Sequence, residues 1–529
     1  MDNPEIFIIM VLYMCVVVGI GVYFYKRAQK SSENYFLGGR SLGPWVAAMS
    51  AEASDMSGWL LMGLPGVAYW CGLADAFWTA LGLAIGTYVN WLIVAKRLRN
   101  YSQIAGNSIT IPDFISNRFK EKKKILLGIS ALFILIFFTV YASSCFVTVG
   151  KLFNTLFGFD YHATLIVGAL FVVAYTLIGG FLAESVSDFM QAIVMILALV
   201  AMIVVGIVNA GGFGAVVENA KNIDGFLSLG EIANPIVDGN KVQQNIAGVP
   251  LFGSANNYSV LSMVSMLAWG LGYFGVPQVL LRFMAIRKPS EIKRSRIIAT
   301  VWCVISLAAA VMIGIIGRTL FPASESLNTA SKAESIIIVM STEYLPLIVA
   351  GLIMAGILAA TISSSDSYLL IASSSVSVNI YKGIVKKDKA TDKQVMWLSR
   401  ITLVVIALVG IIIAWNENSV IFNLVSFAWA GFGATFGPIM LFSLFWKRTT
   451  RSGAIAGMVA GAVSVFVWKL VLNKFLSGTI SIFGIYELLP AFIISSIAIV
   501  VASLLSKKPD KEITDEFDKA KKGELQTAI

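Results

Sequence analysis

An aspartate, Asp55, lies inside an apolar part of the chain, in the segment Ser50–Gly66 that reads SAEASDMSGWLLMGLPG. A carboxylate near the centre of a bilayer costs about 2.5–3.5 kcal/mol even on the lenient insertion scale. The surrounding serines, glycines and proline interrupt a helix rather than extend it. A charge beside a broken helix is typical of an ion or substrate site at the midplane of a transporter. The alternative is a structural acid hydrogen-bonded to the nearby serines.

A second polar cluster occupies Ala360–Ser367, which reads ATISSSDS and contains a further acid, Asp366. Hydroxyl groups at this spacing put at least two of the serines on one face of a helix. Oxygen ligands suit a hard cation such as Na+. The alternative is that these serines bond back to carbonyl groups one turn earlier.

A third acid, Asp188, follows the sequence GGFLAESVSD, where either an ion site or a helix N-terminal cap would explain it. Four aromatic residues, Trp59, Tyr141, Trp269 and Tyr273, lie next to helix breakers or serine-rich turns. Packing or membrane-interface roles are the alternative for each of them. Because Trp59 and Trp269 lie at matching breaks, we expect them to wall a common pocket.

The elements that must position these residues are membrane spans. Hydrophobic residues make up 57% of the 529 residues and charged residues 13%, about half the soluble norm of roughly 25%. Repeated apolar runs of about 20 residues predict an all-α multi-pass membrane protein of about 13 helices. The predicted spans are 5–25, 45–70, 74–95, 125–154, 163–183, 188–210, 258–284, 297–318, 344–380, 395–415, 419–446, 453–473 and 485–505.

The basic residues indicate how these spans are oriented. Alternate loops and the tail hold 32 of the 40 Lys and Arg residues, which places these loops in the cytoplasm. The N-terminus is then expected outside and the C-terminus inside. The outer stretch 211–257 is expected to be a loop, and 506–529 a solvated cytoplasmic tail.

Interrupted spans recur five spans apart, in 45–70 and in 258–284, where Trp269–Pro277 reads WGLGYFGVP. This pairing predicts two inverted five-span repeats, approximately 45–210 and 258–446, within one transmembrane domain, 1–505. Spans 5–25, 453–473 and 485–505 are then peripheral.

Several function classes are disfavoured. The chain has no GxxxxGK[ST] motif, which argues against an ATP-driven pump, and no cytosolic segment long enough for an enzyme domain. The net charge of +10 resides in the loops, so no nucleic acid is expected, and no obligatory protein partner either. A cation channel remains an alternative of another class, although it would need a continuous polar pore.

Seven motifs resemble those of the sodium:solute symporters, and most strongly those that carry proline. They cover nearly the whole chain: YFLGGRSLGP (35–44), the Ser50–Gly66 segment, FFTVYAS (137–143), TLIGGFLA (176–183), WGLGYFGVP (269–277), ILAATISSS (357–365) and SFAWAGFGATFGP (426–438). The resemblance implies a five-plus-five inverted-repeat fold of the APC/LeuT type in the cell membrane. It also implies Na+-coupled import of L-proline by alternating access. The alternatives within the fold are another amino acid, a sugar, sialic acid or pantothenate.

The resemblance also implies site residues. The Na+ ligands would be the carbonyl groups of Ala53, Met56 and Ala360 and the hydroxyl groups of Ser363 and Ser364, with Asp55 linked to the ion. The substrate pocket would consist of Ser57, Gly58, Trp59, Tyr141, Trp269, Tyr273, Pro277 and Gln278. Arg40 and Ser50 match positions linked to coupling. Asp188, Ser363, Asp366 and Ser367 resemble the second Na+ site that some members possess, so more than one Na+ per substrate is a hypothesis.

Overall fold

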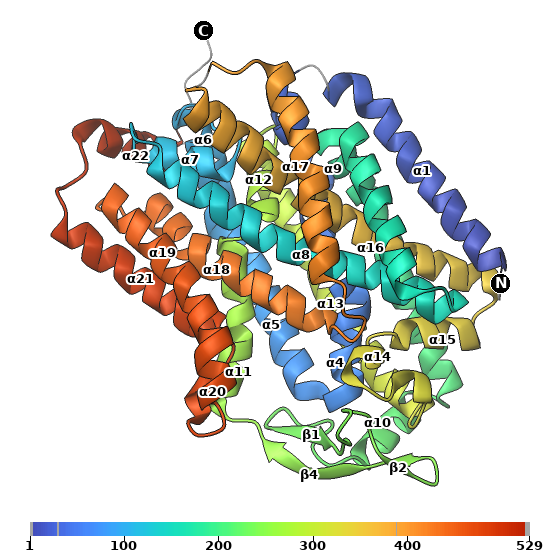
Figure 1. The fold of residues 1–529 in the computed structure, drawn as a ribbon. Helices are drawn as coiled ribbons and strands as arrows, with labels where there is room; N and C mark the ends of the chain where they lie inside the picture. The colour runs from blue at the N-terminus through green and yellow to red at the C-terminus, as the bar shows by residue number, and fades with distance from the viewer. Residues whose placement is uncertain (1–3, 29–30, 388, 524–529) are drawn as a thin grey trace.

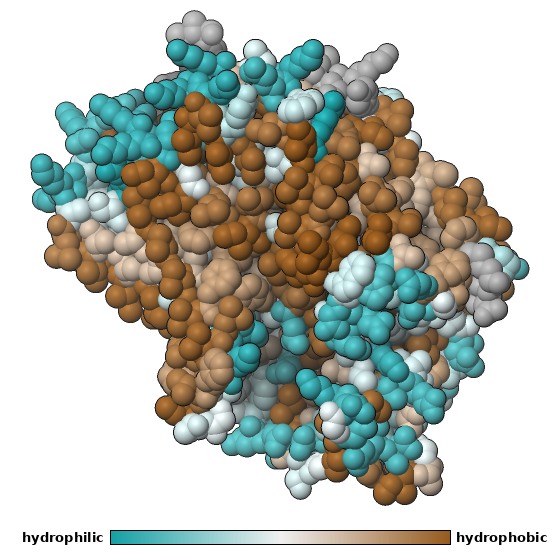
Figure 2. All heavy atoms as spheres, in the orientation of Figure 1, coloured by the Kyte–Doolittle hydropathy of each residue, from teal (hydrophilic) through white to brown (hydrophobic). Residues whose placement is uncertain are grey.

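The computed structural model describes residues 4–28, 31–387 and 389–523. Long helices pack side by side, and small strands lie together at one end of the molecule (Figure 1). Hydrophobic side chains cover the middle of the visible face, and hydrophilic ones gather at its two ends (Figure 2). This distribution is the one expected of a protein that crosses a bilayer.

The helices and strands of the first half, up to the second broken span, are α1 (Pro4–Ala28), α2 (Ser32–Leu37), α3 (Pro44–Asp55), α4 (Leu64–Cys71), α5 (Leu73–Val89), α6 (Ala95–Ile104), α7 (Ile111–Arg118), α8 (Ile125–Phe157), α9 (Tyr161–Asn209), α10 (Phe213–Lys221), β1 (Glu231–Pro235), β2 (Asn245–Ile246), β3 (Val249–Pro250), β4 (Phe252–Asn257), α11 (Val260–Leu267) and α12 (Pro277–Ala285). Those that follow are α13 (Ile292–Leu320), α14 (Ala330–Ala333), α15 (Ile336–Tyr344), α16 (Leu347–Ser374), α17 (Asp392–Ile413), α18 (Ile421–Phe445), α19 (Arg451–Val467), α20 (Lys474–Leu476), α21 (Leu488–Leu505) and α22 (Lys511–Lys522).

The all-α, multi-pass fold is confirmed. Within the described residues, eleven helices are long and apolar enough to cross a membrane, or twelve if α11 and α12, bent by 42°, count as one span. The remaining predicted span, 45–70, consists of α3 and the short apolar helix Trp59–Cys71. The predicted number of thirteen is therefore reached only when both broken spans are counted.

The first break separates α3 from α4. The helical geometry ends at Asp55, because Met56 adopts φ −88° and ψ 75°. A wide π-helical turn, Trp59–Gly63, then leads into α4. A glycine is needed at position 58, since a Cβ atom there would lie 2.5 Å from side-chain atoms of Thr148 on α8.

The second break separates α11 from α12. A 3-10 turn, Ala268–Phe274, follows α11, and Pro277 opens α12, where its missing N–H costs nothing. A Cβ atom on Gly272 would lie 2.0 Å from the indole nitrogen of Trp429, so position 272 also requires a glycine. Both predicted breaks are present. The first allows α8 to approach closely, and the second allows α18 to do so.

The boundary predicted between spans 163–183 and 188–210 is wrong by several residues. The chain turns at Gly180, whose φ of 64° suits a residue without a side chain, and is helical from there to Asn209. The residues 184–187, expected as a loop, are therefore helical. Asp188 consequently lies two turns inside the helix, and its interpretation as an N-terminal cap is also wrong.

Two segments expected to be irregular are ordered. The stretch 211–257 forms α10 and two antiparallel strand pairs, β1 with β4 and β2 with β3. The tail contains α22, which packs on α6 and buries Ile513, Phe517 and Ala520. Apolar residues at positions 513, 517 and 520 give α22 one hydrophobic face, which explains why it docks rather than remaining solvated.

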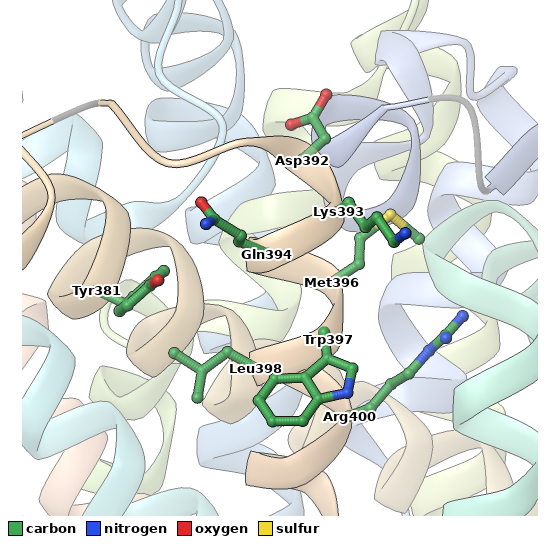
Figure 3. A pocket seen from close by; sticks show the side chains of 8 residues that line it. All are labelled: Tyr381, Asp392, Lys393, Gln394, Met396, Trp397, Leu398 and Arg400. Atoms are coloured by element: carbon green, nitrogen blue, oxygen red, sulfur yellow. The ribbon is translucent and has the colours of Figure 1, made fainter.

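An open pocket flanks the first turns of α17 (Figure 3). None of the residues that the sequence predicts to be functional lines it. Its lining residues are Tyr381, Asp392, Lys393, Gln394, Met396, Trp397, Leu398 and Arg400.

Candidate ion and substrate site

Asp55 joins the two broken spans. The Tyr273 hydroxyl donates a 2.7 Å hydrogen bond to Asp55 Oδ2, across the interface between the breaks. The Asp55 carbonyl group accepts from the Trp59 indole and from the Tyr141 hydroxyl, each at 3.2 Å. Among the described residues, Asp55 Oδ1 has no hydrogen-bond partner. The side chain is therefore held by a tyrosine of the other break rather than by the serines of its own segment.

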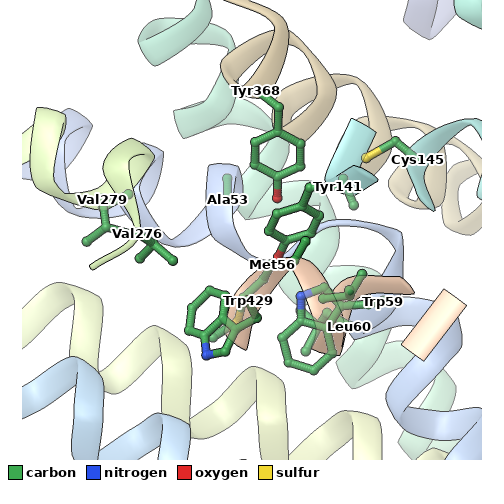
Figure 4. Close-up of a cluster of buried hydrophobic side chains, with 14 of the residues drawn as sticks. Ala53, Met56, Trp59, Leu60, Tyr141, Cys145, Val276, Val279, Tyr368 and Trp429 are labelled. Atoms are coloured by element: carbon green, nitrogen blue, oxygen red, sulfur yellow. The ribbon is translucent and has the colours of Figure 1, made fainter. Parts of the chain in front are cut away.

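Aromatic rings enclose the space between the breaks. The ring centroids of Trp59 and Trp269 are 6.0 Å apart, so the two residues expected to share a pocket lie beside each other. Tyr141 stacks on Tyr368 at 4.1 Å, and Trp429 donates to the Trp269 carbonyl group at 2.8 Å. Figure 4 shows these rings close together: Tyr368 of α16, Tyr141 of α8, Trp59 of the π-helical turn and Trp429 of α18.

The sequence interpretation missed Tyr368 and Trp429. Tyr368 lies four residues after Ser364, on the same helical face, and this spacing is a signal that could have revealed it. Trp429 lies in the motif SFAWAGFG, but nothing in its local pattern separates it from a packing residue.

The residues of the predicted pocket are buried. Its four aromatic residues, Trp59, Tyr141, Trp269 and Tyr273, have exposed fractions of 0–1%. Pro277 and Gln278, at the start of α12, are also buried. The structure therefore represents a conformation in which neither side of the membrane has access to these groups.

A buried ion pair covers the site on the side of the strands. The Phe422 ring lies 5.2 Å from the Trp269 ring, and the Phe422 amide donates to Glu334 Oε1 at 3.0 Å. Glu334 Oε2 accepts from Lys151 Nζ at 2.6 Å and from the Ile421 amide at 2.9 Å. Glu334 thus fixes the start of α18 next to the aromatic wall, which consists of the rings of Trp59, Tyr141, Trp269 and Tyr273.

Two of the predicted Na+ ligands, Ala53 of α3 and Ser364 of α16, are in contact. The Ser364 hydroxyl lies 3.2 Å from the Ala53 carbonyl oxygen and donates to it. Ser363 Oγ is buried and finds no partner in the described part of the chain, whereas Ser365 bonds back to the Thr361 carbonyl group at 2.6 Å. Back-bonding therefore explains Ser365 but not its two predecessors. Met56 follows the end of α3, and Ala360 lies one turn before Ser364.

The second predicted ion cluster contains an arginine that the sequence interpretation missed. Arg282 of α12 is fully buried and pairs with Glu184 and with Asp188, the latter at 3.1 Å. Its guanidinium also donates to Ser367 Oγ at 2.9 Å and to Ser50 Oγ at 3.0 Å. Arg282 lies near the inner end of the predicted span 258–284, where a basic residue is normally expected to face the cytoplasm. The i, i+4 spacing of Glu184 and Asp188 was the available signal for an acidic face.

Asp366 and Ser363 complete this cluster. Asp366 is 1% exposed and lies within electrostatic range of Glu184, Asp188 and Arg282. In the described ranges, neither of its carboxylate oxygens has a hydrogen-bond partner. No three acidic, histidine or cysteine side chains of those ranges converge closely enough to hold a metal ion by themselves. A cation here would need hydroxyl or carbonyl ligands as well.

The two predicted coupling residues belong to separate networks. Ser50 donates to Asp188 Oδ2 at 2.7 Å and so belongs to the acidic cluster. Arg40 instead donates to the carbonyl groups of Met284 and Ser108, each at 2.7 Å, and thereby ties the end of α12 to the α6–α7 turn. Burial, and then the nearby charge of Arg99, lower the pKa of Arg40 to about 10.

Known proteins match the chain over most of its length. A model of the sodium:solute symporter family matches residues 35–461. The chain belongs to this family. Sodium/proline symporters of Staphylococcus aureus, from strains USA300 / TCH1516 and JH9, are each 40% identical over 98% of this symporter and 96% of the relative.

Solved structures show the same fold. A Na+-coupled sialic acid symporter in a substrate-bound outward-open state has a TM-score of 0.73 and 19% identity, over 96% of this symporter and 99% of that chain. A closed nucleobase-cation-symport-1 family transporter has a TM-score of 0.51 and 12% identity, over 93% of this symporter and 99% of that chain. The protein is thus a Na+-coupled solute symporter of the membrane, and the channel alternative has no support.

Proposed function

We propose that the protein imports L-proline together with Na+ by alternating access. The observation that carries this proposal is the 40% identity, over 98% of the chain, with a protein named sodium/proline symporter. The aromatic enclosure between the two breaks supports it, because stacked rings suit a compact apolar ring with a charged end.

The substrate would bind between Trp59 and Trp269, with Tyr141 and Tyr273 at its sides. Its carboxylate would face the start of the π-helical turn Trp59–Gly63, next to Ser57 and Gly58, where the positive end of a helical segment favours an anion. Pro277 and Gln278 would form the edge of the pocket at the start of α12. The amide of Gln278 is buried and unpartnered among the described residues, as expected for a group that meets a substrate.

The coupling Na+ would bind where α3 meets α16. The carbonyl groups of Ala53, Met56 and Ala360 and the hydroxyl groups of Ser363 and Ser364 are neutral oxygen donors, which suit a hard cation. Asp55 would act through its charge rather than as a ligand, since its carboxylate is turned toward Tyr273. Na+ would then order the break in α3 and prepare the pocket for substrate.

A second Na+ would bind at Asp188, Ser363, Asp366 and Ser367. Asp188 Oδ1, Ser363 Oγ and both Asp366 oxygens are buried and unpartnered within the described residues. Unpaired buried acceptors are costly, and a cation would satisfy them. The membrane potential contributes about 2.3 kcal/mol per charge per 100 mV, or about fifty-fold accumulation for each charge moved with one substrate.

Uptake by the purified protein in vesicles tests this function. The loop charges indicate that the N-terminus is outside and the C-terminus inside. For protein in this orientation, an inward Na+ gradient is expected to drive accumulation of labelled proline. Equal K+ or proton gradients are expected to drive none. Competition by other amino acids, a sugar, sialic acid or pantothenate identifies the solute. Na+-driven uptake of one of these in place of proline would contradict the assignment of proline while leaving the coupling intact.

A further inference from the structure

Arg282 connects four helices at the acidic cluster. Its side chain projects from α12 and donates to Ser50 of α3 and Ser367 of α16, and it forms ion pairs with Glu184 and Asp188 of α9. The guanidinium also lies 4.9 Å from the Phe181 ring. A planar guanidinium with several donors in a fixed geometry can hold this many partners at once, which a lysine cannot.

These contacts use only one oxygen of each carboxylate. Asp188 Oδ2 accepts from Arg282 and from Ser50, while Asp188 Oδ1 is left without a partner in the described residues. Glu184 Oε1 accepts from both Arg282 and Ser367. The network therefore fixes Asp188 in one rotamer and leaves Asp188 Oδ1 and Ser363 Oγ without hydrogen-bond partners in the described residues, with the Ser363 side chain in range of the Asp188 carboxylate.

The charges of the cluster are unbalanced. Glu184, Asp188 and Asp366 are acidic, whereas Arg282 is the one cation among the groups that interact with Asp366. Glu184 neutralises the guanidinium. Without Glu184, Arg282 would repel a second cation at Asp188, and without Arg282, Asp188 would be free to turn.

We infer that Arg282 and Glu184 are a positioning pair for a second transported Na+, holding Asp188 so that its free oxygen meets Ser363 and Asp366. This inference rests on the proposed function. It also gives Ser50 a role, because Ser50 links the pair to α3, one turn before the Ala53 carbonyl group of the first ion site. Occupancy of the second site would thereby stabilise the broken span that forms the first.

The test measures charge moved per proline, and the Na+ dependence of uptake, with the full-length protein in vesicles. The wild type is expected to move two charges per proline and to show a sigmoidal Na+ dependence. In Glu184→Gln and Arg282→Lys, the ratio is expected to fall to one and the apparent Na+ affinity to fall about 10–100-fold. Proline half-saturation at saturating Na+ is expected to stay unchanged. Arg318→Gln is the matched control, since Arg318 is a buried arginine that donates instead to Gln243.

The outcomes separate this inference from the proposed function. If Na+ drives no proline uptake in the wild type, the proposed function fails. If uptake is Na+-driven with one charge per proline, only the inference fails. A higher Na+ affinity in Arg282→Lys would mean that Arg282 competes with the ion. An equal loss of Na+ affinity and proline affinity would mean that Arg282 has a merely structural role. Either result overturns the inference. Because a single lost partner can prevent folding, Glu184→Gln/Arg282→Gln removes both charges together and is expected to show the same loss of the second ion.

Discussion

The Tyr273 hydroxyl donates to Asp55 Oδ2 at 2.7 Å, so one hydrogen bond joins the break in α3–α4 to the break in α11–α12. The two residues are separated by 218 positions in the chain and are both fully buried. A movement of one broken span would therefore stretch or break this hydrogen bond to the other. Under the proposed function, we expect the charge of Asp55 to connect ion binding with closure of the pocket.

Asp55→Asn is expected to weaken Na+ activation of proline uptake. The amide keeps the shape of the side chain but removes the negative charge near the proposed ion site. A hydrogen bond to a charged group contributes about 1.5–3 kcal/mol, so we expect the Na+ concentration for half-maximal uptake to rise at least about tenfold. Tyr273→Phe keeps the charge and serves as the comparison, with a smaller effect on Na+ activation. An unchanged Na+ dependence in Asp55→Asn would remove Asp55 from the coupling scheme.

Ser364→Ala is expected to raise the Na+ requirement of uptake, because the Ser364 hydroxyl reaches across to the Ala53 carbonyl group of α3. Ser365→Ala is the matched control, since the neighbouring hydroxyl bonds back to Thr361 of its own helix. Loss of one uncharged hydrogen-bonding group corresponds to about 0.5–1.5 kcal/mol, so a change of up to about tenfold is expected in the first variant and little in the second. Equal effects in both would mean that the serines contribute only to the stability of α16.

The two breaks, and the contact between α3 and α16 at the proposed first ion site, were predictable from the sequence because their signals are local. Asp55, the glycines beside it and the WGLGYFGVP segment each violate the pattern of a membrane helix within a few residues. The pairing of Trp59 with Trp269 followed from the position of these violations in two equivalent spans. Features of this kind can be predicted without information on contacts between residues distant in the sequence.

Arg282 shows what the sequence could not reveal. A basic residue near the end of an apolar run is normally assigned to the adjacent cytoplasmic loop. Here its burial depends on Glu184, 98 residues earlier, and the helical position of Glu184 depends on a turn at Gly180 that lies within an apolar stretch. Hydropathy does not record a turn of this kind, so the acidic residues after it resembled a loop.

Lys151→Met is expected to destabilise the closed conformation. The substitution leaves the Glu334 carboxylate buried and without its cation, which costs about 3–5 kcal/mol for a buried pair. Because Glu334 also holds the first amides of α18, we expect a lower thermal unfolding temperature and easier access of membrane-impermeant reagents to cysteines introduced at the aromatic wall. Lys151→Met/Glu334→Gln removes both charges and is expected to recover most of the stability. A double variant as unstable as the single one would contradict a role for the charge pair itself.

Phe517→Ala is expected to release α22 from the helical core. The Phe517 ring lies under two guanidinium groups, with Arg97 at 4.9 Å and Arg118 at 5.4 Å, and is 4% exposed. Removing a buried phenylalanine ring costs about 3–5 kcal/mol, more than an exposed ion pair such as Lys447–Asp518 supplies. Hydrogen exchange of the α22 amides is therefore expected to become rapid in Phe517→Ala. Asp515→Ala, at an exposed position of the same helix, is expected to leave exchange slow. Slow exchange in both variants would mean that the surface ion pairs hold α22 without the ring.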